Sequence, residues 1–279
     1  MGSEEEAIKK SRAPQTRVSL TADMVAAGVE PGQTLLVHTS LSALGWVCGG
    51  AVTVVEALID ALGARGTLVM PTHSSGNTDP RNWSNPPVPS GWWEIIRENR
   101  PGFDPRTTPS RGMGQVAELF RCWPDALRSS HPSMSFAALG PEAPFITQGH
   151  SLDMSLGERS PLARIHDLGG CVLLLGVDFD KNTSFHLSEY RAGREVTQAE
   201  GSAIKTDSGG RSWREWEDID LNSDPFKEIG RAFEDSGAVS VSAVGCAEAR
   251  HFEQRLAVEF ATQWLRASAP QQHVTKTTA

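Results

Sequence analysis

Three side chains that can handle a proton lie close together in residues 171–190, CVLLLGVDFDKNTSFHLSEY. Thr183 and His186 are three residues apart, as are His186 and Glu189, and this spacing puts all three on one face of a helix. A hydroxyl, an imidazole and a carboxylate on one face are suited to general acid–base chemistry. The structural alternative is that Thr183 caps the helix, His186 is solvated and Glu189 is a surface charge. Spacing alone leaves both interpretations open.

The trio follows a segment with the pattern of a buried strand. Residues 171–175 form an unbroken apolar run, too short for a helix, with glycines on both sides. Asp178 and Asp180 then introduce a short polar loop before the predicted helix start. Open α/β sheets place their sites where a buried strand is followed by such a loop and helix. We therefore expect Thr183, His186 and Glu189 at the edge of an α/β sheet.

The first third of the chain predicts a strand–helix–strand unit. Residues 34–38 and 66–71 have strand patterns, and residues 52–62 between them carry a helical apolar stripe. A loop rich in serine and glycine, residues 39–50, connects the first strand to this helix. Strands joined in this way are parallel, so we expect an α/β fold with a mostly parallel central sheet flanked by helices.

The rest of the chain adds a loop-rich insertion over about residues 72–110 and a β-hairpin in the C-terminal third, with its turn at residues 207–210. We expect one domain over residues 18–266, between a flexible lead-in (1–17) and a flexible tail (267–279). A domain boundary near Arg194 is the alternative. Further helices are predicted at residues 20–27, 92–97, 114–121, 160–168, 225–236 and 247–266, and further strands at 135–139 and 239–244.

Composition is that of a soluble globular protein, with 39% hydrophobic and 22% charged residues. No apolar run approaches the length of a membrane span, and the acidic N-terminus lacks the apolar segment of a secretory signal, so a cytoplasmic protein is expected. The net charge of −8 argues against a nucleic-acid surface and is compatible with a cationic ligand. The four widely spaced cysteines are expected to be reduced thiols.

Known cofactor motifs are mostly missing from the sequence. Residues 112–117 match G-x-G-x-x-A, but a buried strand does not precede them, so we do not expect a dinucleotide site. Phosphate or amide contacts at that helix start remain an option, because Arg111 adds positive charge. The histidines lack metal-ligand spacing, so no metal is predicted. A metal site is the less favoured alternative, because five histidines lie at predicted strand ends or loops: His38, His73, His131, His166 and His186.

Several stretches together resemble the antibiotic N-acetyltransferase family, the aminoglycoside 3-N-acetyltransferases. The resemblance covers most of residues 35–191 and part of the C-terminal third. It implies an α/β fold distinct from the GNAT fold, acetyl-CoA as donor and the 3-amino group of a 2-deoxystreptamine aminoglycoside as acceptor. The stretches that carry it include LLVHTSLSALGWVCGGAVTVVEAL, GTLVMPTHS, PPVPSGWWEIIRENRPGFDPRTTPSRGMGQVAELFR, RSSHPSMSFAALG and SPLARIHDLGGCVLLLGVDFDKNTSFHLSEYRA.

The resemblance also implies roles for individual residues. His186 matches the catalytic histidine of the family, and Thr183 matches a threonine that stabilises the tetrahedral intermediate. Glu217 and Asp218 fall where the family places carboxylates near the acceptor or the catalytic histidine, so Asp218 is a candidate partner of His186 beside Glu189, which its spacing suggests. The residues that match the CoA-holding stretches are Thr39, Ser40, Leu41, Ser42, Ala43, Leu44, Gly45, Val52, Thr53, Arg111, Met113, Gly114, His131, Pro132 and Ser135.

The chemistry of amine acetylation agrees with these roles. An amine that is protonated at neutral pH must lose a proton before it attacks a thioester, and a histidine with a carboxylate partner is a suitable base. Direct attack requires both substrates to be bound together, with a donor such as Thr183 beside the developing oxyanion. Carboxylates also neutralise a polycationic acceptor. The candidate acceptor contacts are His73, Glu94, Asp104, Asp178, Glu217 and Asp218.

Three other functions are compatible with the same residues. The first is an enzyme of this fold that acetylates a different amine, and the second is an acyl-enzyme formed on Cys48, which lies in a glycine loop. The third is a protein that binds an aminoglycoside without catalysis. We expect a monomer or homodimer with the aminoglycoside and acetyl-CoA as its ligands, and no nucleic acid or membrane partner.

Overall fold

Three short buried strands occupy the centre of the protein. The computed structural model describes residues 2–206 and 208–268, so most of the predicted tail and Asp207 of the hairpin turn lie outside the described residues. Strand β1 (Thr34–Thr39) pairs in parallel with β2 (Thr67–Pro71) on one side and with β5 (Cys171–Leu175) on the other. Every residue of β2 and β5 is buried, as their apolar sequences predict.

The sheet contains seven strands in the order β3-β4-β2-β1-β5-β9-β8. The strands outside the central three are β3 (Leu127–Arg128), β4 (Phe136–Leu139), β8 (Ser240–Val244) and β9 (Ala247–Glu253), all of which pair antiparallel. The predicted α/β sheet with flanking helices is confirmed, but the sheet is mixed rather than mostly parallel. The sequence of an edge strand does not show whether it pairs parallel or antiparallel, because the direction depends on how the strand lies relative to its neighbour.

The predicted closing helix over residues 247–266 is wrong in its first part. Residues of β9 pair with β5, with Phe252 opposite Val172, and the helix α10 (Gln254–Ser268) begins only afterwards. Alanine, glutamate and arginine favour helices, which explains the prediction. Here the alternation that buries Ala247 and Ala249 and the pairing with a central strand override that preference.

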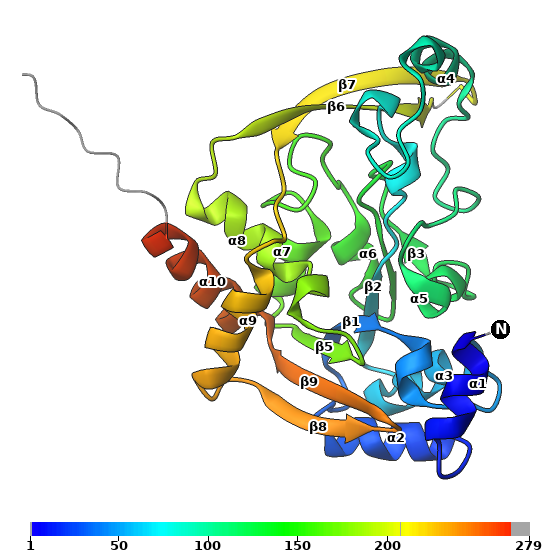
Figure 1. Ribbon diagram of the computed structural model, residues 1–279, viewed down its shortest axis with the longest axis vertical. Helices are drawn as coiled ribbons and strands as arrows, with labels where there is room; N and C mark the ends of the chain where they lie inside the picture. Colours follow the sequence, from blue (N-terminus) through cyan, green and yellow to red (C-terminus); the bar gives the residue numbers. More distant parts are fainter. Residues whose placement is uncertain (1, 207, 269–279) are drawn as a thin grey trace, which may run out of the picture.

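Helices cover both faces of the sheet (Figure 1). Alternate residues of a strand point to opposite faces, so Leu35 and Val37 pack in one layer while Leu36 packs in the other. The first layer contains α2 (Arg17–Ala26), α3 (Ala51–Leu62) and α5 (Gly114–Phe120), and the second contains α6 (Ala143–Thr147), α7 (Pro161–Asp167), α8 (Ser184–Ala192), α9 (Phe226–Asp235) and α10. In the described part of the chain, no helix has both the length and the apolar character needed to cross a bilayer.

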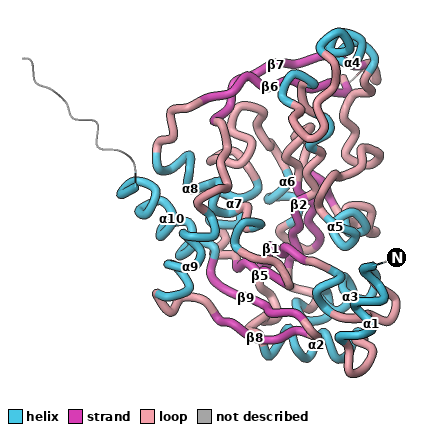
Figure 2. The backbone as a smooth tube through the Cα atoms, viewed as in Figure 1, coloured by secondary structure: helices cyan, strands magenta, loops and turns pink. Residues whose placement is uncertain are grey.

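The insertion and the hairpin form an upper lobe (Figures 1 and 2). The insertion is mostly loop, as expected, with the short helix α4 (Trp93–Asn99) close to its predicted place. The hairpin of β6 (Thr197–Lys205) and β7 (Arg211–Ile219) is a separate two-stranded sheet. An isolated hairpin is marginally stable, and this one is held by the insertion: Phe103 N donates to Ala203 O at 2.8 Å and Lys205 Nζ pairs with Asp104 at 2.8 Å.

The segment expected to be a flexible lead-in contains a helix, α1 (Gly2–Lys10). Its first turn contains Glu4 and Glu5 and its last turn Lys9 and Lys10, which is the charge order that the helix dipole favours. Ala7 is 6% exposed, so the helix is packed against the body despite its polar sequence.

The close packing of α9 predicts that a substitution favourable for an isolated helix will destabilise this protein. A Cβ at Gly230 would lie 2.0 Å from Phe179 Cγ, so Gly230→Ala must displace a fully buried ring. We expect a loss of about 1–3 kcal/mol in the free energy of unfolding, measured by urea denaturation. Gly91→Ala is the control, because nothing lies within 4 Å of its Cβ position. Equal stabilities of the two variants would contradict this account.

Candidate active site

The carboxyl ends of the parallel strands gather polar side chains from distant parts of the chain. His38 is the penultimate residue of β1, His73 follows β2 by two residues, and the loop after β5 leads to Thr183. Adjacent parallel strands end at the same edge of a sheet, and this is the edge where α/β proteins place their sites. His38 Nε2 consequently lies 3.3 Å from Thr183 Oγ1, although the two residues are 145 positions apart.

His186 is paired with Glu189 on α8. Nδ1 of His186 lies 2.6 Å from Oε2 of Glu189, whose side chain is 3% exposed. The other carboxylate oxygen, Oε1, accepts a hydrogen bond from the backbone N–H of Asn222 at 2.9 Å. Both oxygens of Glu189 are therefore fixed, and Nδ1 of the imidazole is occupied, which makes Nε2 the ring nitrogen available for proton transfer.

Asp218, the other candidate partner of His186, lies in a different network. Its Oδ1 accepts a hydrogen bond from Tyr190 Oη at 2.7 Å, and its Oδ2 accepts one from the backbone N–H of Ser155 at 2.9 Å. The i, i+3 spacing on one helix thus brings Glu189 to the imidazole, whereas Asp218 holds the base of β7 against the body.

Thr183 does not use its side chain as a helix cap. It occupies the N-cap position of α8, but its hydroxyl makes no capping hydrogen bond. The structural alternative for this residue is therefore wrong, and its hydroxyl is directed to His38 instead. The side-chain oxygen Oδ1 of Asn182 instead accepts a hydrogen bond from the backbone N–H of Ser184 at 3.2 Å.

His38 is a site residue that the sequence prediction missed. Its ring is buried, and burial lowers its pKa to about 3, so it is neutral at physiological pH. Burial likewise lowers the pKa of His73 to about 3, and the neighbouring imidazoles of His186 and His38 further disfavour its protonated form. Its position in the sequence could have indicated this role, because a histidine at the end of a buried parallel strand lies at the edge of the sheet where ligands bind.

A cavity of about 670 Å³ opens beside His38 and Thr183. Gly112 and Gly114 line it with φ angles of 77° and 82°, which side chains rarely adopt, so glycine is required at this turn. Seven of the predicted cofactor-binding residues line the cavity: Thr39, Ser40, Leu41, Ser42, Gly45, Met113 and Gly114. The lining residues that were not predicted for the site include Glu4, Ala7, His38, Trp46, Val47, Gly112, Gln115 and Lys181.

The other predicted cofactor-binding residues are not among the residues that line this cavity. Leu44 is fully buried in the core, and Thr53 Oγ1 donates to Cys48 O at 2.6 Å. Val52 is 43% exposed on α3. Ala43 accepts a hydrogen bond from Lys10 through its carbonyl group, and the Arg111 backbone N–H donates to His73 O at 2.8 Å.

His131, Pro132 and Ser135 also lie away from the large cavity. Nδ1 of His131 accepts the backbone N–H of Met134 at 2.9 Å, and burial lowers the pKa of this histidine to about 4. The carbonyl oxygen of Pro132 accepts Asn77 Nδ2 at 3.0 Å. These contacts stabilise the loop that precedes β4.

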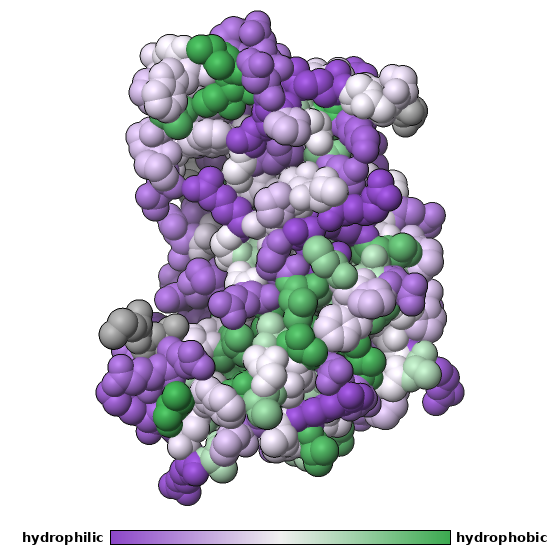
Figure 3. Space-filling view, turned by 90° about the vertical axis from the view of Figure 1, so that its right-hand side faces the viewer, coloured by the Kyte–Doolittle hydropathy of each residue, from purple (hydrophilic) through white to green (hydrophobic). Residues whose placement is uncertain are grey.

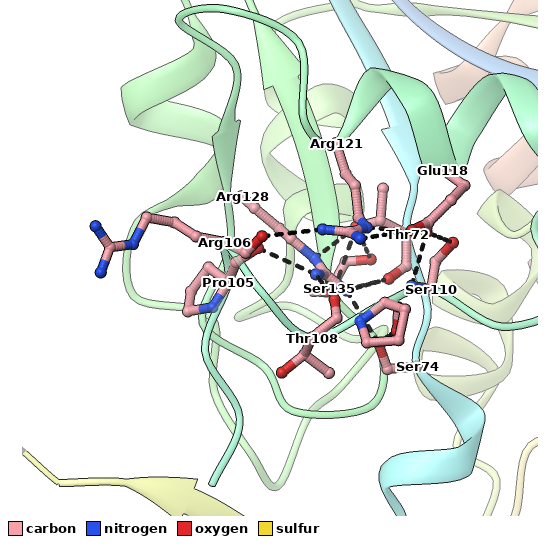
Figure 4. A network of polar contacts seen from close by, with 11 residues as sticks. Thr72, Ser74, Pro105, Arg106, Thr108, Ser110, Glu118, Arg121, Arg128 and Ser135 are labelled. Atoms are coloured by element: carbon pink, nitrogen blue, oxygen red, sulfur yellow. Dashed lines mark hydrogen bonds and ion pairs between the residues drawn. The ribbon is translucent and has the colours of Figure 1, made fainter. Parts of the chain in front are cut away.

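Ser135 belongs to a network centred on Arg128 (Figure 4). Nε of Arg128 donates to Thr72 Oγ1 at 3.1 Å and to Ser135 Oγ at 3.0 Å, and Nη2 donates to Ser74 Oγ at 2.9 Å. Nη1 donates to the carbonyl oxygen of Thr108 in the insertion. Burial lowers the pKa of Arg128 to about 10, so it is charged at neutral pH and ties the insertion to the end of β2.

A second cavity, of about 230 Å³, lies between the hairpin and the body. Its lining contains three carboxylates, Glu200, Asp218 and Asp220, together with His131 and Trp216. Burial raises the pKa of Glu200. Leu221 also lines this cavity, and the next residue, Asn222, is the one that fixes Glu189. Helix α8 carries the His186–Glu189 pair, which we call the dyad. Its N-cap residue Thr183 lines the large cavity, and Glu189 is hydrogen-bonded to the segment that lines the smaller one.

Of the predicted acceptor contacts, Asp218 lines the smaller cavity, whereas the other five are not among the described residues that line either cavity. Asp104 pairs with Lys205, which lowers the pKa of this carboxyl to about 2, and Asp178 caps a short helical turn. Glu94 and Glu217 are exposed, and His73 packs edge-on against Phe136. Among residues 2–206 and 208–268, no three His, Cys, Asp or Glu side chains form a cluster suited to a metal ion.

Comparison with known proteins gives the same family over nearly the whole chain. Residues 36–266 match the family described as aminoglycoside 3-N-acetyltransferase. The chain is 45% identical over 258 residues to the SPbeta prophage-derived aminoglycoside N(3')-acetyltransferase-like protein YokD of Bacillus subtilis, covering 92% of this chain and 94% of that one. It is 33% identical over 283 residues to aminoglycoside N(3)-acetyltransferase IX of Micromonospora chalcea, with 93% and 96% covered.

Solved structures with the same arrangement extend this similarity. The crystal structure of YokD has a TM-score of 0.92 at 43% identity, covering 95% of this chain and 98% of that one. AAC-IIIb in a binary complex with CoASH has a TM-score of 0.82 at 31% identity, with 91% and 97% covered. AAC-VIa bound to sisomicin has a TM-score of 0.80 at 28% identity, with 91% and 98% covered.

The buried neutral histidines predict a loss of stability in acid. The folded-state pKa values of His38 and His73 are about 3, whereas an unfolded histidine titrates near 6.5. Below about pH 6.5 the unfolded chain binds protons that the folded chain does not, so the free energy of unfolding falls as pH falls.

His38→Asn removes one of these titrating groups. We expect the free energy of unfolding of this variant to fall less steeply between pH 6.5 and 4, by about 1 kcal/mol per pH unit. Urea unfolding at several pH values measures this slope. Comparing slopes rather than absolute stabilities separates the titration from the loss of packing at His38. An unchanged slope would contradict the assignment of a neutral buried imidazole.

Proposed function

The chain belongs to the aminoglycoside 3-N-acetyltransferase family, and we propose that it transfers the acetyl group of acetyl-CoA to the 3-amino group of a 2-deoxystreptamine aminoglycoside. The observation that carries this proposal is the position of the His186–Glu189 dyad on helix α8. The N-cap residue of this helix, Thr183, lines the large cavity, and Glu189 is hydrogen-bonded to Asn222, next to Leu221 in the lining of the smaller one. Such an arrangement suits a reaction in which two substrates are bound together and react directly.

The large cavity is the proposed donor site. A similar structure, AAC-IIIb, is a complex with CoASH. The backbone of residues 39–45 and the turn at Gly112–Gly114 offer groups that can bond to the amides of a pantetheine arm, and Lys181 supplies a positive charge for phosphate. The thioester of acetyl-CoA supplies the electrophilic carbonyl group of the reaction.

His186 is the proposed general base. An aliphatic amine is largely protonated at neutral pH, so the attacking nitrogen must lose a proton during the reaction. Glu189 accepts the hydrogen bond from Nδ1–H, which leaves Nε2 with its lone pair free to take that proton. The same carboxylate then stabilises the imidazolium that forms.

Thr183 and His38 are proposed to stabilise the oxyanion. In the tautomer that we assign, the neutral His38 carries its proton on Nε2 and donates it to Thr183 Oγ1, 3.3 Å away. The threonine proton is then free to be donated to the oxygen of the tetrahedral intermediate. A donor that is already oriented before the charge develops is the kind of group that lowers such barriers most.

The smaller cavity is the proposed site for the acceptor. An aminoglycoside carries several ammonium groups, and AAC-VIa, a similar structure, was solved with sisomicin. Asp218, Asp220 and Glu200 provide negative charge here, and the first of these is already fixed by Tyr190 and Ser155. The proposed acceptor carboxylates are therefore these three rather than the exposed Glu94 and Glu217.

The reaction can be tested by thiol release from acetyl-CoA, followed with a thiol-reactive dye. Kanamycin, gentamicin, neomycin and apramycin are offered separately as acceptors. Release that depends on one or more of them supports the proposed function. Bound CoA with no release across this panel would instead favour an enzyme of this family acting on another amine.

The Cys48 acyl-enzyme can be tested in the same assay. Cys48 is not among the described residues that line the two cavities, so Cys48→Ser should retain turnover. Loss of activity in that variant, together with an acetylated wild-type enzyme, would favour the covalent mechanism.

The roles proposed for His186 and Glu189 predict that variants at these positions lose turnover but keep their affinity for CoA. We expect His186→Ala to lower kcat by about 10²- to 10⁴-fold, because the base is removed, while the Kd for CoA changes by less than about twofold. Glu189→Gln should lower kcat by at least about 10²-fold, because an amide can donate to Nδ1 and so favour the wrong tautomer.

The control for these variants is Glu228→Gln, an exposed position on α9. Its kcat should equal that of the wild type. Steady-state kinetics and calorimetric titration with CoA make the comparison. Near-normal turnover by His186→Ala would rule out the assignment of the base.

A further inference from the structure

The N-terminal helix α1 is attached to the loop over residues 40–50, which lines the large cavity. Lys10 Nζ donates to the carbonyl oxygens of Ser42 and Ala43, the second at 3.0 Å. These carbonyl groups are at the end of the short helical turn Leu41–Leu44, where a cation is favoured. Ser11 Oγ accepts the backbone N–H of Trp46 at 2.7 Å.

The chain that follows α1 continues this attachment as backbone pairing. Gln15 N–H donates to Trp46 O at 2.8 Å, and Cys48 N–H donates to Gln15 O at 2.9 Å. Residues 10–15 therefore hold the outer part of the loop in place through both side-chain and backbone contacts.

Helix α1 also contributes directly to the cavity. Glu4 and Ala7 are among its lining residues, together with Trp46. Oε1 of Glu4 accepts the indole N–H of Trp46 at 3.2 Å, which fixes the orientation of a large flat side chain in the wall. Figure 3 shows the surface indented on this side of the molecule, between the upper lobe and the body.

A helix of nine residues is not stable in water by its own hydrogen bonds. Its surface ion pair, Glu5 with Lys9, joins two side chains that are 64% and 70% exposed and adds little. The contacts of α1 with the loop over residues 40–50 are therefore what stabilise this helix. The family match begins at residue 36, so this helix precedes the part of the chain that the family description covers.

We infer that α1 forms the outer wall of the acyl-donor site and contributes to the affinity for CoA. The inference rests on the proposed function, in which this cavity binds acetyl-CoA. A carboxylate beside a phosphate would be repelled, so the part of the donor that lies along Glu4 and Trp46 is the uncharged pantetheine arm. The helix acts by positioning Trp46 and closing the cavity, whereas His186, Glu189 and Thr183 carry out the chemistry.

Two pairs of neighbouring residues allow a matched test. Glu4 and Lys10 contact the cavity wall, whereas Glu5 and Lys9 pair with each other on the solvent side of the same helix. Calorimetric titration with CoA would compare Glu4→Ala with Glu5→Ala, and Lys10→Met with Lys9→Met. Alanine and methionine are good helix formers, so each pair has the same change in charge without a loss of helix propensity.

We expect Glu4→Ala and Lys10→Met each to weaken CoA binding by about fivefold, which corresponds to one lost hydrogen bond, while both controls bind as the wild type does. Glu4→Gln keeps an acceptor for the Trp46 indole and should bind within about twofold of wild type. The KM for the aminoglycoside and the value of kcat should not change in the control variants Glu5→Ala and Lys9→Met.

Equal CoA affinity in the wall variants and their controls would overturn the inference. Tighter binding by both Glu4→Ala and Glu4→Gln would also overturn it, because that result means phosphates rather than the pantetheine arm lie beside Glu4. Failure of the wild-type protein to bind CoA is a separate outcome, which contradicts the proposed function itself.

Discussion

The parallel pairing of β1 with β2 and β5 is the constraint on which the rest of the protein depends. Leu36 faces Val69 on one side and Val172 on the other, and the strands are buried on both faces. A shift of one residue in either pairing would exchange the residues of the two core layers, so the register is strongly fixed. With the register fixed, the ends of the strands must meet, and His38 and Thr183 become neighbours.

The charged side chains Glu189 and Arg128 at this edge are removed from water, at least in part, and protein groups satisfy them. Glu189 is almost fully buried, yet it accepts hydrogen bonds from the imidazole and from a backbone N–H. Arg128 is a half-buried cation whose donors contact hydroxyl and carbonyl oxygens of the insertion and of the end of β2 (Figure 4). Removing any one partner would leave a desolvated polar group, so these networks hold the upper lobe to the body at a defined position.

The two cavities differ in the chemical groups that line them. The larger one is formed mainly by loops and turns of the body and by α1, and its backbone groups suit a long ligand with amides. The smaller one is formed largely by β6, β7 and the segment after them, and its carboxylates suit an amine. Since the hairpin packs on the insertion, sequence changes in either segment can alter the proposed acceptor site while the strand ends with His38 and Thr183 remain in place.

Local patterns in the sequence were sufficient for features that depend on neighbours along the chain. The apolar runs of β1, β2 and β5, the helical stripe of α3 and the i, i+3 spacing of His186 and Glu189 are all of this kind. Resemblance to the family added seven residues that line the large cavity. Only the tertiary structure decided which carboxylate contacts His186, that residues 247–253 form a strand, that α1 is docked and that His38 joins the site. The physical reason is that these outcomes depend on burial and pairing between segments far apart in the chain, which local propensity and spacing do not determine.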